Sequence, residues 1–275
     1  ATDPGLDRQA CQETLELLEW PLVCQHLSDF TSTRMGRDAA RTLELPVSLA
    51  ASSQRLAETV EMVVLDDLSE GGLSFRGVVD LRPVLLRCSK GGVASGEELL
   101  GVAETLAAAR RLRRQIDQPE LRPVCTALIE MMVTLPELEQ RLKIALEEGG
   151  RVADRASAPL AGLRQQWQGL RQERRDKLQE MLRRLGTVLQ DTVIAERHGR
   201  PVLAVKAGAV SQVPGQVHDS SASGSTLFVE PRSVLSIGNK LVDLEARIRD
   251  EERKVLAELS GHVAEEEPTL AQLVL

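Results

Sequence analysis

Residues 201–231 form a short segment of strand-type sequence within a chain whose other segments have helix-type periodicity. Three runs in it are rich in β-branched residues or alternate in polarity, at 201–206, 215–219 and 226–230, and each is predicted as a strand. Pro214 and Gly215 predict a turn before the second strand, and the Ser/Gly-rich residues 221–225 predict one before the third. We therefore expect a small three-stranded antiparallel sheet.

A long helix is predicted before this sheet. Ser157 is a suitable N-cap, and Pro159 lies in the first turn, where proline is tolerated. Apolar residues then recur at mostly three- and four-residue steps, as Leu160, Leu163, Trp167, Leu170, Leu178, Met181, Leu185, Val188 and Thr192. We expect this helix to continue to the breakers Gly199 and Pro201, which at 1.5 Å per residue makes it about 60 Å long.

A second long helix is predicted after the sheet. From residue 234 to about residue 263, apolar side chains again recur on one side, as Ile237, Leu241, Leu244, Ile248, Val255, Leu256 and Leu259. The chain is therefore expected to run out along one helix, form the sheet, and return antiparallel along the other.

The first 156 residues are predicted to form a helical bundle. Ser95 and Glu98 form a capping box at the start of one helix, and Pro136 opens another, which Gly149 ends. Further helices are expected over residues 9–42 with breaks, 48–69 and 79–88. The predicted fold is mainly α, with a bundle at 1–156, an outgoing helix at 157–200, the sheet at 201–231 and a returning helix at 232–275.

Charge is distributed unevenly along the chain. The net charge is −7, which argues against a generally basic nucleic-acid binder, because phosphate contacts supply most non-specific affinity. Residues 160–206 nevertheless contain ten Lys or Arg against five Asp or Glu, a local +5. By charge alone, a solvated helix face with ion pairs between successive turns explains this excess better than a nucleic-acid surface does.

The region around the sheet resembles a known family. The strings ERHGRPVLAVK (196–206) and GQVHDSSASGSTLFVEP (215–231), together with TLELLEW (14–20) and STRMGR (32–37), are similar to the second bacterial branch of the MutS family, MutS-II. The resemblance covers essentially the whole chain. It implies that the two long helices are the levers of that family and that the sheet is its clamp, carried on a MutS-like helical core.

The resemblance also implies parts that this sequence does not contain. Full-length MutS-II proteins resemble mismatch-repair MutS in core, clamp and a carboxy-terminal ATPase that uses ATP and Mg²⁺, and they commonly end in a small nuclease domain called Smr. We therefore expect this chain to be an amino-terminal fragment with no cofactor of its own.

Three function classes are consistent with the resemblance. The clamp could grip the sugar-phosphate backbone of branched or recombining DNA, in a protein that suppresses homologous recombination. The same region could instead contact ribosomal RNA or protein on collided ribosomes that the ATPase then splits. A weaker alternative is a dimerisation scaffold with a coiled coil between protomers, which the irregular heptad disfavours; self-association is expected of the full-length protein.

The candidate nucleic-acid ligands lie in the clamp and on the outgoing lever. Those of the clamp are expected to donate to phosphates through side chains or turn amides and are Arg197, Arg200, Lys206, His218, Ser221, Ser223, Gly224 and Arg232. A basic lever face is expected from Arg171, Arg174, Arg175, Arg183 and Arg184. Phe228 and Glu230 match the letters of the Phe-x-Glu wedge with which MutS contacts mispaired bases, but in this position Phe228 is expected to belong to a small clamp core.

No catalytic or metal site is predicted. The phosphate-binding pattern GxxxxGK[ST] is absent, and for His218 beside Asp219 a stabilising hydrogen bond is favoured over nucleophilic catalysis. The four cysteines, at 11, 24, 88 and 125, lack metal-ligand spacing. No apolar run approaches the roughly 20 residues that span a bilayer, and no leader opens the chain. A cytoplasmic location without membrane contact is therefore expected.

Overall fold

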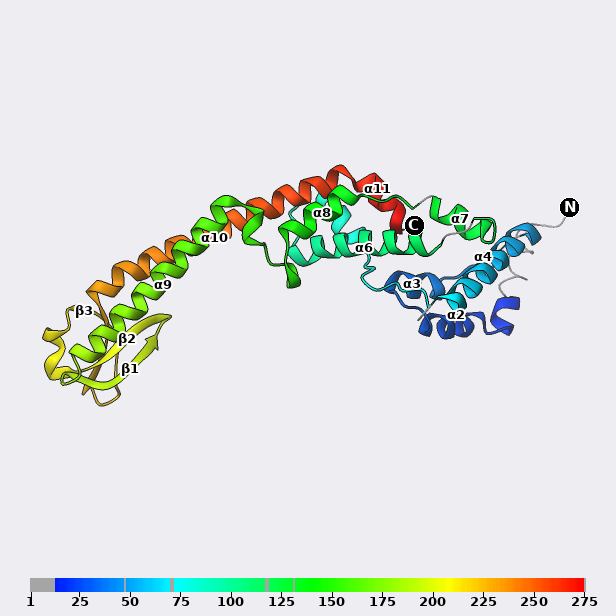
Figure 1. Cartoon of the computed structure of the whole chain (residues 1–275). Coiled ribbons are helices and arrows are strands. Elements are labelled where there is room, and N and C mark those ends of the chain that lie inside the picture. Colours follow the sequence, from blue (N-terminus) through cyan, green and yellow to red (C-terminus); the bar gives the residue numbers. More distant parts are fainter. Residues whose placement is uncertain (1–12, 47, 70–71, 117–118, 131, 275) are drawn as a thin grey trace. The chain divides into compact units, whose positions relative to one another are not determined.

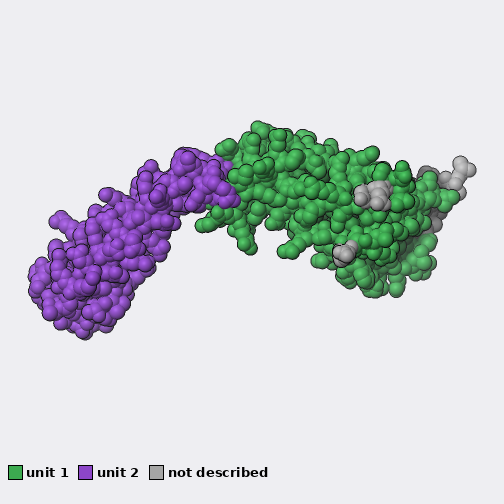
Figure 2. Space-filling view, in the orientation of Figure 1, with its two compact units in different colours: residues 1–152, 256–275 green, residues 153–255 purple. Residues whose placement is uncertain are grey.

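The computed structural model describes residues 13–46, 48–69, 72–116, 119–130 and 132–274. The chain divides into two compact units (Figure 2). Unit 1 comprises residues 1–152 and 256–275, and unit 2 comprises residues 153–255. The described residues form a mainly helical protein with one small, four-stranded antiparallel sheet, and none of their helices is both long and apolar enough to cross a membrane.

Unit 1 consists of helices joined by short connections (Figure 1). In chain order these are α2 (Trp20–Asp29), α3 (Arg34–Arg41), α4 (Leu49–Leu68), α5 (Arg82–Ser89), α6 (Gly96–Gln115), α7 (Pro123–Glu130), α8 (Pro136–Ala145), the 3-10 turn η1 (Glu148–Gly150), α11 (Glu267–Ala271) and η4 (Gln272–Val274). The helix α10 (Arg232–Glu265) contributes its last residues, from Leu256 onward, to this unit.

Helix α6 forms much of the core of unit 1. The predicted capping box at its start is confirmed: Ser95 accepts a hydrogen bond from the Glu98 amide, and the Glu98 carboxylate accepts one from the Ser95 amide. Eleven of its residues are buried, including Leu99, Val102 and Leu106. So many buried positions leave little room for a polar face, and α6 is therefore covered by neighbouring helices, including α8.

Several predicted helices of unit 1 are confirmed, with shifts at their ends. Helix α4 begins after the N-cap Ser48, and α8 begins at Pro136. The helix expected over residues 79–88 starts later, at Arg82, because Pro83 takes a first-turn position. The sequence patterns do not predict α7. The part of the first expected helix at residues 9–12 lies outside the described residues, as does Cys11.

Unit 2 contains the two long helices α9 (Ala158–Arg184) and α10, which run side by side in Figure 1. Polar contacts join them within one chain. The Trp167 indole donates to Glu245 at 3.0 Å, Arg164 pairs with Glu252 at 2.6 Å, and the Ser157 hydroxyl donates to Glu251 at 2.7 Å. Helix α9 is therefore paired with a helix of the same chain.

The sheet of unit 2 has the order β1-β2-β4-β3, with all neighbouring strands antiparallel. Its strands are β1 (Leu189–Arg197), β2 (Arg200–Lys206), β3 (Gly215–Ser220) and β4 (Thr226–Pro231), and the 3-10 helix η3 (Ala207–Gln212) connects β2 to β3. One face packs its apolar side chains against the end of α9 in a buried cluster of Leu178, Leu189, Leu203, Val205, Val213, Val229 and Val234.

Two predictions for this region are wrong. The outgoing helix ends at Arg184 and not near residue 200, so it is about 40 Å long, and the sheet has four strands and not three. The cause is the segment Thr192, Val193 and Ile194, whose consecutive β-branched side chains favour a strand. The predicted helix breaker Gly199 belongs instead to a hairpin turn, in which His198 and Gly199 have φ values of 52° and 73°.

Candidate nucleic-acid interface

The hairpin of β1 and β2 places two predicted ligands, Arg197 and Arg200, opposite each other. The register of the strands puts both on the sheet face that also carries Phe228 and Glu230, opposite the face that carries Leu203 and Val229. The hairpin and strand β4 thus bring together basic, acidic and aromatic side chains on one surface of the sheet.

Arg197 is held by three neighbours. Its Nε donates to Oδ2 of Asp219 at 3.1 Å, its Nη1 donates to the carbonyl of Glu196 at 2.8 Å, and its guanidinium carbon lies 3.9 Å from the centre of the Phe228 ring. The prediction that Phe228 belongs to the core of this unit is therefore wrong. Phe228 is only half-buried and lies beneath Arg197, because the alternation along β4 directs Leu227 and Val229 to the core side.

Arg200 and His218 share a buried carboxylate. Oε2 of Glu230 lies 2.8 Å from Nε2 of His218, and Oε1 lies 3.5 Å from Nη1 of Arg200, a distance of an ion pair and not of a hydrogen bond. Nη2 of Arg200 donates to Asn239 of α10 at 3.2 Å. Glu230 is completely buried. The charge of Arg200 and the hydrogen bond with His218 offset only part of the cost of removing this carboxylate from water, because Oε1 of Glu230 and Nη1 of Arg200 have no hydrogen-bond partner in the described structure. Arg200 and His218 are thus engaged within the sheet.

Sequence reasoning does not assign a role to Glu230 in the clamp. One signal is available: Glu230 stands between Val229 and Pro231 in a strand of apolar residues, where a carboxylate is expected only with a partner. Its two partners, His218 and Arg200, lie on other strands and are distant in the sequence, so they follow only from the register.

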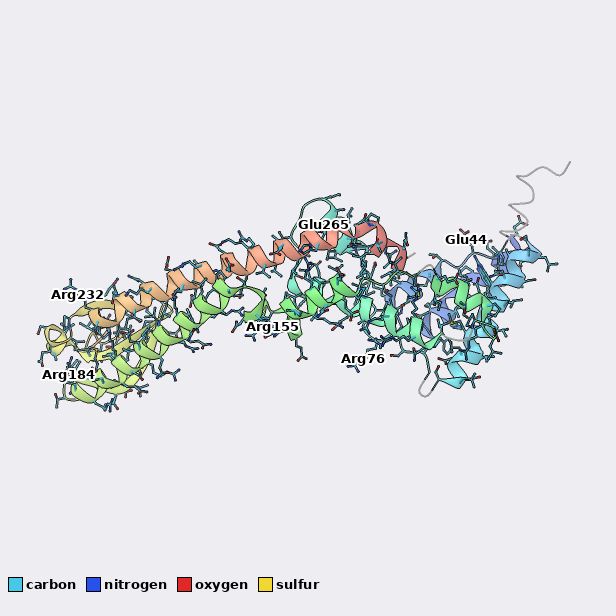
Figure 3. The ribbon with its side chains drawn as sticks, turned by 45° about the horizontal axis from the view of Figure 1, so that its top comes forward. Glu44, Arg76, Arg155, Arg184, Arg232 and Glu265 are labelled. Atoms are coloured by element: carbon cyan, nitrogen blue, oxygen red, sulfur yellow. The ribbon has the colours of Figure 1, made fainter. Side chains whose placement is uncertain are left out.

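Lys206 and Arg232 lie at the ends of strands and are exposed. Nζ of Lys206 donates to the carbonyl of Thr187 at 3.0 Å. Arg232 is the first residue of α10, and its backbone amide donates to Pro214 at 2.9 Å. In the described part of the chain its guanidinium has no partner (Figure 3 labels it near the end of the two helices).

The loop between β3 and β4 is closed by its own hydrogen bonds. The Ser221 amide donates to Thr226 at 2.9 Å, and the Gly224 amide donates to Ser221 at 2.8 Å. The Ser221 hydroxyl accepts from the Thr226 amide, and the hydroxyls of Ser223 and Ser225 are 2.8 Å apart. Gly224 has φ of 70°, a conformation that glycine adopts without strain. The amides of Ser221 and Gly224 are therefore used internally, while the serine hydroxyls lie on an exposed loop.

The five arginines predicted for α9 do not form one face. Successive residues of a helix are about 100° apart, so Arg171, Arg174 and Arg175 fall within a single arc of about 100°, whereas Arg183 and Arg184 project in other directions. The reason is their spacing: the eight residues from Arg175 to Arg183 make more than two turns but not a whole number of turns, so the later side chains do not line up with the earlier ones.

Their contacts differ as well. Arg171 lies 5.2 Å from the Trp167 ring, and Nε of Arg183 approaches the carbonyl of Gln179 at 3.4 Å. Within the described structure Arg174, Arg175 and Arg184 have no side-chain partner, and the last two are exposed.

The two units carry opposite net charge. Unit 2 contains 17 Lys or Arg and 13 Asp or Glu, a net of +4, and the remaining residues contain 17 and 28, a net of −11. Since a polyanion is attracted to positive and repelled by negative potential, a nucleic acid would approach unit 2 in preference to unit 1. The exposed guanidinium groups of unit 2 that have no partner within the described structure are those of Arg175, Arg184, Arg232, Arg247, Arg249 and Arg253, and each can contact phosphates. Arg175 and Arg184 are nine residues apart and so project from opposite sides of α9.

Among the described residues, no group of three or more His, Cys, Asp and Glu side chains could hold a metal ion. The three described cysteines, Cys24, Cys88 and Cys125, are buried and reduced.

Comparisons with known proteins identify several relatives whose sequences align with most of this chain. The chain is 43% identical over 254 residues to the endonuclease MutS2 of Synechocystis, an alignment that covers 92% of the chain and 31% of that protein. It is 37% identical over 262 residues to the endonuclease MutS2 of Symbiobacterium thermophilum and 32% identical over 266 residues to that of Geobacillus, covering 94% of the chain in each case. The chain spans about a third of the length of these relatives. No family model matches the chain.

Proposed function

Because this chain belongs to the MutS-II family, we propose that it is the nucleic-acid-clamping region of a larger protein and grips branched or recombining DNA. In this proposal α9 and α10 are the levers of the family and the four-stranded sheet is its clamp. The ATPase and nuclease activities, and the suppression of homologous recombination, belong to the larger protein.

The observation that carries the proposal is the set of exposed and unpaired arginines in a unit of net charge +4. Arg175, Arg184 and Arg232 can each offer two hydrogen-bond donors to a phosphate without breaking a contact within the protein. By contrast, Arg197 and Arg200 are engaged with Asp219 and Glu230. A phosphate that paired with either of them would have to compete with a carboxylate.

Contacts of this kind hold the sugar-phosphate backbone and do not read the base sequence. We therefore propose binding that depends on the shape of the nucleic acid and weakens steeply with salt, since each phosphate contact releases condensed counterions. The acidic unit 1 restricts such contacts to unit 2.

A competition experiment tests the proposal. The purified chain is bound to a fluorescent four-way DNA junction at low salt, and unlabelled junction, linear duplex of the same base composition, and a ribosomal RNA hairpin are added as competitors. The proposal predicts that the junction competes best. Preferential competition by the RNA hairpin would overturn it in favour of a ribosomal partner, and lack of binding to any of the three would remove a nucleic-acid role from this region.

A further inference from the structure

We infer that the stacked pair of Arg197 and Phe228 is a platform for an unpaired nucleobase. This inference rests on the proposed function and specifies it: the DNA that unit 2 binds would offer at least one splayed base next to its phosphates, as a branch point does.

Arg197 is poorly suited to a phosphate. Its charge is compensated by Asp219, whose Oδ2 lies 3.1 Å from Nε, and its Nη1 is occupied by the carbonyl of Glu196. Binding of a phosphate at the same guanidinium would place two anions beside one cation. The predicted role of Arg197 as a phosphate ligand is therefore the less favourable use of this side chain.

Part of the Arg197 side chain remains accessible to solvent. One face of the guanidinium is covered by the Phe228 ring at 3.9 Å, and two of its nitrogens are bonded, yet 37% of the Arg197 side chain is exposed. The occupied positions leave Nη2, the methylene stem and the outer face of the planar group as the places where this exposed area can lie. The Phe228 ring on one face and the two hydrogen-bond acceptors at the edges hold this guanidinium in place. It is therefore a preorganised stacking surface, because the rotamers of the Arg197 side chain are already restricted.

Unpaired bases of single-stranded nucleic acids stack on arginine planes and on aromatic rings, whereas the bases of an intact duplex are stacked on one another and cannot. Here the aromatic ring of Phe228 is already covered by Arg197, so the ring supports the platform and the guanidinium is the surface that the base would meet. Asp219, 44% exposed at the edge of the platform, can accept a hydrogen bond from a base amino group.

The experiment compares strands that have the same phosphates but differ in their bases. A single-stranded oligothymidine and an abasic strand of equal length are bound to the wild-type chain and to Arg197→Lys, which retains the positive charge but lacks the plane. Phe228→Leu, which retains an apolar side chain but lacks the ring, is a second variant, and far-ultraviolet circular dichroism checks that each variant is folded.

The inference predicts that the wild type binds the base-bearing strand about 5- to 150-fold more tightly than the abasic strand, the range of one stacked base. Both variants should lose most of this preference while their affinity for blunt duplex changes less than about twofold. Equal binding of the two strands by the wild type, with duplex or junction binding intact, would overturn the platform and leave the proposed function standing. Retention of the base preference by Arg197→Lys would also overturn it. Failure to bind any nucleic acid would overturn both.

Discussion

The carboxylate of Glu230 lies 2.8 Å from Nε2 of His218 and is completely buried, although it belongs to a strand only six residues long. His218 lies on β3 and Glu230 on β4. Arg200, the second basic neighbour, lies on β2 and also contacts Asn239 of α10. One buried carboxylate thus links three strands of the sheet to the first turns of the following helix.

Removal of this carboxylate should destabilise unit 2. We expect Glu230→Ala to lower its free energy of unfolding by about 3–5 kcal/mol, because breaking a buried ion pair leaves uncompensated charge behind. Urea unfolding followed by circular dichroism measures the change. Glu196→Gln, at an exposed position of β1, is the matched control and should change stability by less than about 0.5 kcal/mol. Similar small effects of both substitutions would show that Glu230 does not stabilise the sheet.

Gly238 of α10 lies close to the same cluster. A Cβ atom at this position would come within 2.9 Å of Nη1 of Arg200 and 3.3 Å of Oε1 of Glu230, whereas one at Gly261 of the same helix would meet no atom within 4 Å. Alanine stabilises an exposed helix interior by up to about 1 kcal/mol relative to glycine. We therefore expect Gly261→Ala to raise the thermal midpoint and Gly238→Ala to lower it. Equal increases from both would mean that Arg200 moves aside at no cost in stability.

A pH-dependent contribution is expected in unit 1. Burial alone would raise the pKa of Glu139, but hydrogen bonds from Arg110 and Lys143 outweigh it and hold the pKa below its ordinary value. A carboxyl group whose pKa is lowered by folding stabilises the protein fully above its unfolded pKa of about 4.3, and this contribution is lost as the pH falls through the folded pKa.

Glu139→Gln should consequently destabilise the chain by about 1.5–3 kcal/mol at pH 7. The difference between variant and wild type should shrink as the pH is lowered below about 4.3. Chemical unfolding at several pH values measures it. Glu137→Gln, at an exposed position of the same helix, should show no comparable difference. A wild-type advantage that is constant with pH would contradict the ionic origin of the effect.

The helices of this protein are predictable where local sequence decides their ends. The capping box of Ser95 and Glu98 fixes a helix start through contacts within a few residues, and Pro136 does so through its own backbone conformation. The structure has both helix starts at these positions. The switch from helix to strand after Arg184 is not predictable in this way, because Leu185, Val188 and Thr192 continue the spacing of a helix. Leu185 and Val188 instead pack against the core of the sheet from the turn before β1, and Thr192 lies in β1. When a short stretch fits both the helical and the strand period, tertiary contacts decide which of the two it forms.

The candidate site is predictable in its residue types but not in their pairing. Arg197 and Asp219 are 22 residues apart, and Arg200 and Glu230 are 30 apart, so only the strand register shows that these arginines have internal carboxylate partners. The exposed residues Arg184 and Arg232 are predicted ligands because of their charge, and no interaction in the described structure competes with that use.

The central claim is that nucleic acid is held by the unpaired arginines of unit 2. Two triple variants with the same change in net charge test it: Arg175→Glu, Arg184→Glu and Arg232→Glu in unit 2, and Arg37→Glu, Lys90→Glu and Arg114→Glu at exposed positions of unit 1. The measurement is the affinity for a four-way DNA junction as a function of salt concentration. We predict that the unit 2 variant binds more than about tenfold more weakly at low salt and that its logarithmic salt slope falls by about 0.9 for each phosphate that the variant no longer binds, while the unit 1 variant stays near the wild type. Equal weakening in the two variants would contradict the claim and assign the binding to net charge alone.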